Sequence, residues 1–214
     1  MGQLACDDGN LVSGDGCSST CTIETGYTCS GGTTTTADTC SEICGDGKHM
    51  GKLACDDGNT VSGDGCSSTC SIESGWTCSG GTTTTKDTCT EICGDGKHMG
   101  QLACDDGNTV SGDGCSSTCT IETGYSCSGG TTTTKDTCSE ICGDGRHMGK
   151  LACDDGNTVS GDGCSSACAI ETGYTCSGGT TTSKDTCYEI CGDGLNMGHY
   201  ACDDGNVVNG DGCS

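Results

Sequence analysis

Residues 44–92 read CGDGKHMGKLACDDGNTVSGDGCSSTCSIESGWTCSGGTTTTKDTCTEI, and this 49-residue block recurs along the whole chain. Residues 93–141 differ from it at six positions, for example Lys52 against Gln101 and Trp76 against Tyr125, so 43 of 49 positions are identical. Near-identical tandem copies multiply one surface, whereas catalysis needs a single arrangement of groups. We therefore expect a protein that is not an enzyme.

The repeat divides the chain into a partial repeat at 1–43, full repeats at 44–92, 93–141 and 142–190, and a partial repeat at 191–214. Met1 occupies the position of Met50, and Ser214 stops inside a repeat. The partial repeats hold five and three cysteines, against six in each full repeat. We expect a window on a longer repetitive chain, with some cysteine partners outside it.

The composition is that of a disulfide scaffold, because 26 of 214 residues are cysteine while aromatic residues make up 3% and Phe is absent. A unit this small cannot bury a sufficient apolar core, so covalent staples must replace it. Three disulfides per repeat would each contribute roughly 2–4 kcal/mol. Disulfides persist in oxidising compartments, so we expect an extracellular or cell-surface protein.

The local patterns predict small disulfide-rich tandem repeats, mostly loops and turns with short β-hairpins and little helix. Segments 75–81 and 86–92 have the pattern of two short strands joined by a threonine-rich tip. Segment 67–74 is expected to hold one helical turn, capped by Ser67 or Ser68. Only three residues separate Cys89 from Cys93, which predicts tightly coupled repeats in an elongated rod, with a disulfide able to cross the boundary.

The motif CDDGN-x3-GDGCS-x2-C, followed by Glu-x-Gly-aromatic-x-Cys, lies at residues 55–78 and in each other complete copy. It resembles the myxococcal-type cysteine-rich repeat, a disulfide module found in tandem in extracellular proteins. The resemblance implies a secreted disulfide-bonded module and says little about activity. The near-identity of the copies and the threonine-rich insert depart from the usual pattern of that family.

Six cysteines per repeat allow fifteen pairings. The set is Cys44, Cys55, Cys66, Cys70, Cys78 and Cys89, with equivalents every 49 residues. Cys78 and Cys89 flank the expected hairpin, so we favour that pair. The other four leave three pairings open, or more if a disulfide crosses the repeat boundary.

An acidic, glycine-rich loop in each repeat offers oxygen ligands of the kind that Ca²⁺ prefers. In the second repeat its oxygen-bearing residues are Asp46, Asp56, Asp57, Asn59 and Asp64. The spacing is not that of an EF-hand. The alternative interpretation is that Asp, Asn and Gly are present because turns need them. No cofactor is required, and calcium is the one candidate.

A run of adjacent hydroxyl residues recurs at the expected hairpin tip and is a candidate O-glycan acceptor. It comprises Thr33, Thr34, Thr35 and Thr36; Thr82, Thr83, Thr84 and Thr85; Thr131, Thr132, Thr133 and Thr134; and Thr180, Thr181, Thr182 and Ser183. No Asn-x-Ser/Thr sequon occurs, which excludes N-glycosylation. The alternatives are a plain polar loop tip and an ice-binding threonine array.

His49, His98 and His147 follow a Gly-Asp-Gly turn, and the last copy has Asn196 there. Disulfides would consume the thiolates that zinc needs, so we expect solvent-exposed histidines. The aromatic position, occupied by Tyr27, Trp76, Tyr125 and Tyr174, is expected to anchor the small core of each repeat, with stacking against sugar as the alternative.

A net charge of −23 argues against nucleic acid and anionic membranes as partners. The function that these features favour is a structural subunit of an extracellular, O-glycosylated fibre or cell-surface appendage. Its partners would be further copies of the same chain or its own continuation, and covalent glycans, with no membrane insertion by this segment. The alternative is a repetitive adhesin or stalk that displays one binding module, calcium-dependent or not, many times.

Overall fold

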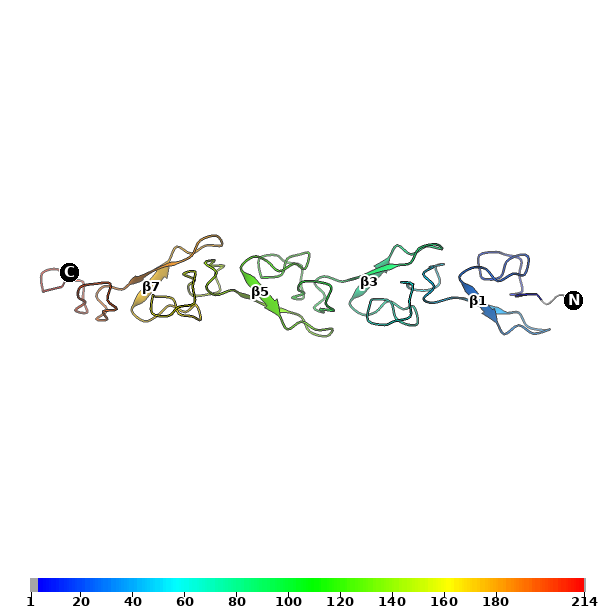
Figure 1. The fold of residues 1–214 in the computed structure, drawn as a ribbon, viewed down its shortest axis with the longest axis horizontal. Coiled ribbons are helices and arrows are strands. Elements are labelled where there is room, and N and C mark those ends of the chain that lie inside the picture. Colours follow the sequence, from blue (N-terminus) through cyan, green and yellow to red (C-terminus); the bar gives the residue numbers. More distant parts are fainter. Residues whose placement is uncertain (1–3, 214) are drawn as a thin grey trace. The chain divides into compact units, whose positions relative to one another are not determined.

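The computed structural model describes residues 4–213; residues 1–3 and 214, which belong to the two partial repeats, lie outside the described residues. The chain divides into two compact units, Met1–Leu102 and Ala103–Ser214. The described residues hold no helix; their strands are β1 (Tyr27–Ser30), β2 (Thr39–Glu42), β3 (Trp76–Ser79) and β4 (Thr88–Glu91) in the first unit, and β5 (Tyr125–Ser128), β6 (Thr137–Glu140), β7 (Tyr174–Ser177) and β8 (Thr186–Glu189) in the second (Figure 1). The prediction of small disulfide-rich repeats with short hairpins is confirmed.

Each hairpin pairs two four-residue antiparallel strands in one register. In β3–β4, Trp76 lies opposite Glu91 and Cys78 lies opposite Cys89. Alternation along a strand places the aromatic ring and the cysteine on the same face, because they are two residues apart. That face packs on the loop that precedes the hairpin in the chain, since Cys78 and Cys89 contact the buried cysteines of that loop.

The expected helical turn at 67–74 is wrong. Cys70 donates its backbone N–H to the Ser67 carbonyl oxygen at 2.8 Å, which closes a turn, and Cys70 itself has a positive φ of 54°. A residue in this left-handed region cannot continue a right-handed helix. Cys66 and Ile72 instead form an isolated antiparallel bridge around the turn.

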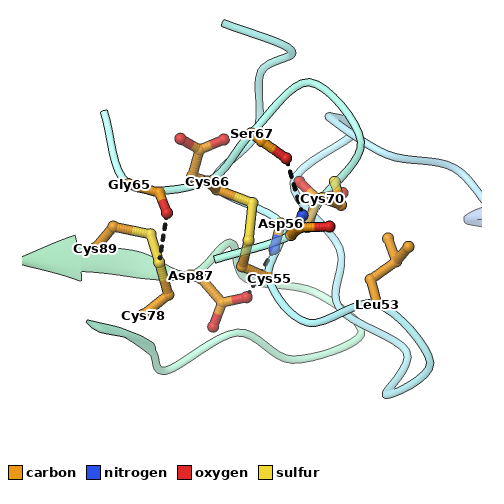
Figure 2. The surroundings of a disulfide bond; sticks show 12 residues. Leu53, Cys55, Asp56, Gly65, Cys66, Ser67, Cys70, Cys78, Asp87 and Cys89 are labelled. Carbon is orange, nitrogen blue, oxygen red and sulfur yellow. Dashed lines mark hydrogen bonds between the residues drawn. A yellow bond between two sulfur atoms is a disulfide. The ribbon is translucent and has the colours of Figure 1, made fainter. Parts of the chain in front are cut away.

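The core of a repeat is made of sulfur rather than of aliphatic side chains. Cys55, Cys66 and Cys70 are buried, and the partly buried residues packed on them are Cys44, Leu53, Cys78 and Cys89 (Figure 2). The larger aliphatic side chains remain outside: Val61 is 63% exposed and Ile72 is 43% exposed. Disulfides therefore perform the packing role that apolar clusters have in larger domains.

The aromatic residue covers this core from the hairpin side, as expected. Trp76 is 5% exposed and lies over Gly65, whose φ is +112°. A Cβ atom on Gly65 would meet Trp76 at 2.9 Å and Cys89 closer still. Only glycine allows the backbone to approach the ring and the Cys78–Cys89 disulfide this closely.

Candidate functional site

The structure pairs Cys78 with Cys89, the pair that the sequence favoured. It also selects one of the three pairings that the sequence left open for the other four cysteines. In the second repeat the bonds are Cys44–Cys70, Cys55–Cys66 and Cys78–Cys89, with sequence separations of 26, 11 and 11 residues. The second unit repeats this pattern in Cys142–Cys168, Cys153–Cys164 and Cys176–Cys187. No bond of these two repeats crosses the boundary at residues 92–93 or 190–191. Each of these repeats is thus covalently closed by itself.

Two cysteines among the described residues carry no disulfide, Cys21 and Cys191. Cys21 holds the position of Cys70 in its repeat, and Cys191 holds that of Cys44. In the complete repeats these positions form the disulfide with a separation of 26 residues. For both cysteines, the position 26 residues away falls outside residues 1–214.

The five oxygen-bearing residues of the calcium hypothesis do not form one site. Asp56 is fully buried, and its two carboxylate oxygens accept backbone N–H groups: Oδ2 from Gly45 at 2.9 Å, and Oδ1 from Gly47 at 3.0 Å and Gly58 at 2.9 Å. A buried carboxylate needs such donors to offset its loss of water. Asp56 therefore holds two glycine-rich turns together.

The remaining residues of that set have other hydrogen-bond partners. Asp46 accepts the Lys48 N–H at 3.0 Å and pairs with the Lys48 ammonium group at 3.5 Å. Asp57, Asn59 and Asp64 line one shallow pocket, where the Asn59 side-chain amide donates to Asp64 at 3.0 Å. Within residues 4–213, no group of three or more His, Cys, Asp or Glu side chains is placed to hold a metal ion.

Asp57 and Asp64 face one another. Burial raises the pKa of Asp57, and the negative charge of Asp64 adds to the effect, against the Asn59 N–H, which lowers it. Burial and the equivalent aspartates, Asp113 and Asp162, raise the pKa of Asp106 and Asp155 in the same way. Like charges held close together cost stability when both are ionised.

The histidines are not solvent-exposed, so that expectation was wrong. The His49 side chain is 20% exposed; its Nδ1 lies 2.7 Å from an oxygen of Asp87, and its Nε2 lies 2.9 Å from the Leu53 carbonyl oxygen. Both ring nitrogens of His49 lie within hydrogen-bond distance of an oxygen atom. His147 repeats it with Asp185 and Leu151. In the last copy, Asn196 donates to the Tyr200 carbonyl oxygen at 3.1 Å and so replaces the Nε2 contact.

Asp87 is the partner that sequence reasoning missed. It is 4% exposed and accepts the N–H groups of Asp56 and Gly81, each at 2.8 Å (Figure 2). Burial alone would raise the pKa of Asp87, but these two N–H groups and the neighbouring His49 outweigh it, and the pKa is lowered. This carboxylate connects the hairpin to the preceding loop across 31 residues of sequence.

A second missed group is the glutamate that ends each hairpin. Glu42, the last residue of β2, is 8% exposed and accepts the N–H groups of Lys52 at 2.7 Å and Leu53 at 3.2 Å. It thereby ties the partial repeat 1–43 to the repeat 44–92. The bond from the Lys52 position recurs at Glu91, Glu140 and Glu189, which accept the N–H groups of Gln101, Lys150 and His199. The available signal was that a glutamate occupies this position in all four copies.

The threonine tract forms the tip of each hairpin loop, as expected. Thr82 and Thr85 exchange backbone hydrogen bonds, at 2.8 and 3.3 Å, and leave Thr83 and Thr84 at the turn. All four residues are exposed. The tip also contacts the body of its repeat, because the His49 N–H donates to the Thr82 carbonyl oxygen at 2.9 Å.

These features define a class of protein: a tandem array of disulfide-closed modules in which buried carboxylates satisfy backbone N–H groups. The chain belongs to the family described as Domain of unknown function (DUF4215), whose model matches residues 26–71, 75–120, 124–169 and 173–214. No curated protein and no solved structure matches the chain. No helix within residues 4–213 has the length and apolarity to cross a membrane.

Proposed function

We propose that this chain is a segment of an extracellular structural protein, a fibre or cell-surface appendage built from near-identical disulfide modules. The observation that carries the proposal is the covalent closure of the repeats 44–92 and 142–190 by three disulfides each, around a core that has almost no aliphatic packing. Such a module depends on oxidising conditions for its stability. The resemblance to the myxococcal-type repeat supports the same location.

The mechanism of the proposed function is mechanical. Disulfides limit how far a module can extend, and the buried glutamate at the end of each hairpin ties it to the next module. The junction has no flexible linker, since Cys44 follows Glu42 after a single residue. A chain built this way resists bending at the junctions and resists proteases within the modules.

O-linked glycans on the exposed threonine tips complete the proposal. At each tip, four adjacent hydroxyl residues are exposed together. A glycan coat would add to the hydration that the charge of −23 already provides.

Immunogold electron microscopy of the native secreted material tests the structural role. An antibody against the folded hairpin should label filaments at regular intervals along their length. Label on dispersed, non-filamentous material would contradict it.

The exposed valine of each acidic loop favours the second candidate, a multivalent adhesin. Val12, Val61, Val110 and Val159 are each 62–63% exposed at the same position of their repeats. A side chain displayed identically in every copy could give avidity to a weak contact. An adhesin should bind its target surface more tightly as copies are added and lose binding when these valines become serine; a structural subunit should do neither.

A further inference from the structure

The hydroxyl groups of each threonine tip are not equivalent. Thr85 Oγ1 donates to the Gly80 carbonyl oxygen at 3.2 Å, so the hydroxyl hydrogen between Thr82 and Thr85, which are 2.6 Å apart, comes from Thr82. Thr82 Oγ1 also accepts the backbone N–H groups of Thr84 at 3.2 Å and Thr85 at 3.1 Å. The first and fourth hydroxyls therefore hold the turn in shape.

The second hydroxyl of the tract is the one that makes no hydrogen bond. Within residues 4–213 this holds for all four copies, at Thr34, Thr83, Thr132 and Thr181, while the third hydroxyl lies 3.4–3.5 Å from the first. One residue of the four tracts is not threonine, and its hydrogen bonds agree with these two roles of the hydroxyl groups. Ser183 replaces threonine at the fourth position and keeps the same bonds, to Thr180 at 2.7 Å and to the Gly178 carbonyl oxygen at 3.2 Å.

A shallow pocket of about 280 Å³ lies beside the free hydroxyl in the first unit, lined by Gly14, Glu24, Thr25, Tyr27, Met50 and Thr83. The second unit has an equivalent pocket of about 290 Å³ that includes Tyr125, Met148 and Thr181. Thr83 comes from one repeat and Tyr27 from the repeat before it. The pocket therefore spans a junction between consecutive repeats.

The lining suits a sugar ring, which has an apolar C–H face and a rim of hydroxyls. Met50 lies against Gly26 and joins Tyr27 in forming the apolar part. Both oxygens of Glu24 accept the Gly14 N–H, at 2.8 and 2.7 Å, and Oε2 also accepts the Gly16 N–H at 2.9 Å, so the carboxylate is fixed in place and Oε1 keeps a lone pair for a hydroxyl donor. The volume is just below the roughly 300–1,000 Å³ of sites for drug-sized ligands, which fits a single small ring.

We propose that the second threonine of each tract is the O-glycan attachment residue, and that at Thr83 and Thr181 the first sugar lies in the pocket of the preceding repeat. The inference rests on the glycosylated form of the proposed function. The sugar would fill the pocket at the junction and add contacts between consecutive modules that the protein alone does not make. The glycan would then stiffen the chain as well as hydrate it.

The attachment chemistry requires a glycosyltransferase and a nucleotide-activated sugar. The Thr83 Oγ1 lone pair forms a bond to the anomeric carbon, and the bond from that carbon to the donor phosphate breaks, so the nucleoside diphosphate leaves with its electron pair. The hydroxyl proton passes to a base of the transferase. A hydroxyl with no internal hydrogen bond loses none of the turn's contacts when it reacts, whereas reaction at Thr82 would remove the donor to Thr85.

Site-resolved glycopeptide mapping by electron-transfer mass spectrometry tests the assignment on the full chain secreted by a glycosylating host. Sugar should be found on Thr34, Thr83, Thr132 and Thr181, and Thr83→Ala should remove it from its tip. The matched variant Thr84→Ala should retain it. Sugar on Thr82, Thr84 or Thr85 but not on Thr83 would overturn the inference and leave the glycosylated structural function standing; no sugar on any tract would overturn both.

Methyl NMR of the same chain tests the pocket. Enzymatic removal of the glycans should shift the Met50 and Met148 methyl resonances. In the Thr83→Ala variant, glycan removal should no longer shift the Met50 resonance but should still shift that of Met148, because each methionine lines the pocket of a different junction. Glycosylated Thr83 with an unchanged Met50 resonance would overturn the seating of the sugar in the pocket.

Discussion

At the scale of single residues, buried carboxylates accept backbone N–H groups that helices and sheets satisfy in other proteins. Asp56, Asp87 and Glu91 are each at most 7% exposed, and each accepts backbone N–H groups. Loops rich in glycine leave many such donors without a partner, and a buried N–H without a partner costs about as much as a lost hydrogen bond. Part of the acidity of this chain is therefore internal and structural.

Glu42→Gln should destabilise the junction between the first two repeats. Glutamine has one side-chain oxygen, so either the Lys52 or the Leu53 N–H loses its acceptor. A buried unsatisfied donor costs roughly 1–3 kcal/mol. Urea unfolding measures the loss, and Ser41→Ala, at the exposed neighbouring position, is the control. Equal stability of both variants would show that the glutamate does not hold the junction.

Stability should fall in acid because of Asp87 and Asp185. Their pKa values are lowered in the folded state from 3.8, against burial, by backbone N–H groups and then by the histidines. A carboxyl lowered on folding stabilises the fold above its unfolded pKa, and this contribution is lost as the pH falls through the folded pKa. Thermal unfolding without reductant should show a midpoint that drops below about pH 4.

The variant Asp87→Asn, Asp185→Asn provides the comparison for the acid response. It should be less stable than the parent at pH 7, since asparagine cannot accept every hydrogen bond that the carboxylate accepts. Below pH 4 its midpoint should depend less steeply on pH. A slope equal to that of the parent would assign the acid response to other groups.

At the scale of elements, the hairpin and the preceding loop form one body because glycine lets them meet. Gly65 passes beneath Trp76 and the Cys78–Cys89 disulfide. The Cys78 sulfur lies 3.5 Å from the Gly65 carbonyl oxygen (Figure 2). Tyr takes the place of Trp76 in the other copies. Its hydroxyl donates to the carbonyl oxygen of a nearby glycine, as Tyr27 does to Gly14 at 3.1 Å.

Gly65→Ala and Gly63→Ala should differ in their cost. Both glycines have positive φ, at +112° and +102°, but a Cβ on Gly63 would meet nothing within 4 Å. Gly63→Ala should lose only the roughly 1–3 kcal/mol of backbone strain. Gly65→Ala should lose about 1–3 kcal/mol more through overpacking. Denaturant unfolding measures both, and equal losses would contradict the close approach of loop and ring.

At the scale of the whole molecule, disulfides and buried carboxylates stand in for a hydrophobic core throughout the described residues. The buried apolar residues are cysteines and one aromatic side chain per repeat. When the disulfides open, the repulsion among the acidic side chains favours expansion of the chain. The modules therefore share one dependence on the redox state of their surroundings.

Reduction should unfold the chain rather than loosen it. With the disulfides opened, the charge of −23 should expand the polypeptide at low ionic strength, and salt should contract it, since the Debye length shortens to about 10 Å at 0.1 M. Small-angle scattering with and without reductant measures the radius. A reduced chain with the radius of the oxidised one would show that the modules fold without their disulfides.

The sequence by itself determined the repeat, the hairpins, the threonine tip and the need for disulfides, because these follow from local periodicity and composition. Cys78–Cys89 could be proposed since both cysteines flank one hairpin. The Cys44–Cys70 bond, the His49–Asp87 pair and the roles of Asp56 and Glu42 were decided only by the tertiary structure. Their partners lie in other turns, and an aspartate in a glycine-rich loop suits a cation and a backbone N–H equally well until the fold places one of them beside it.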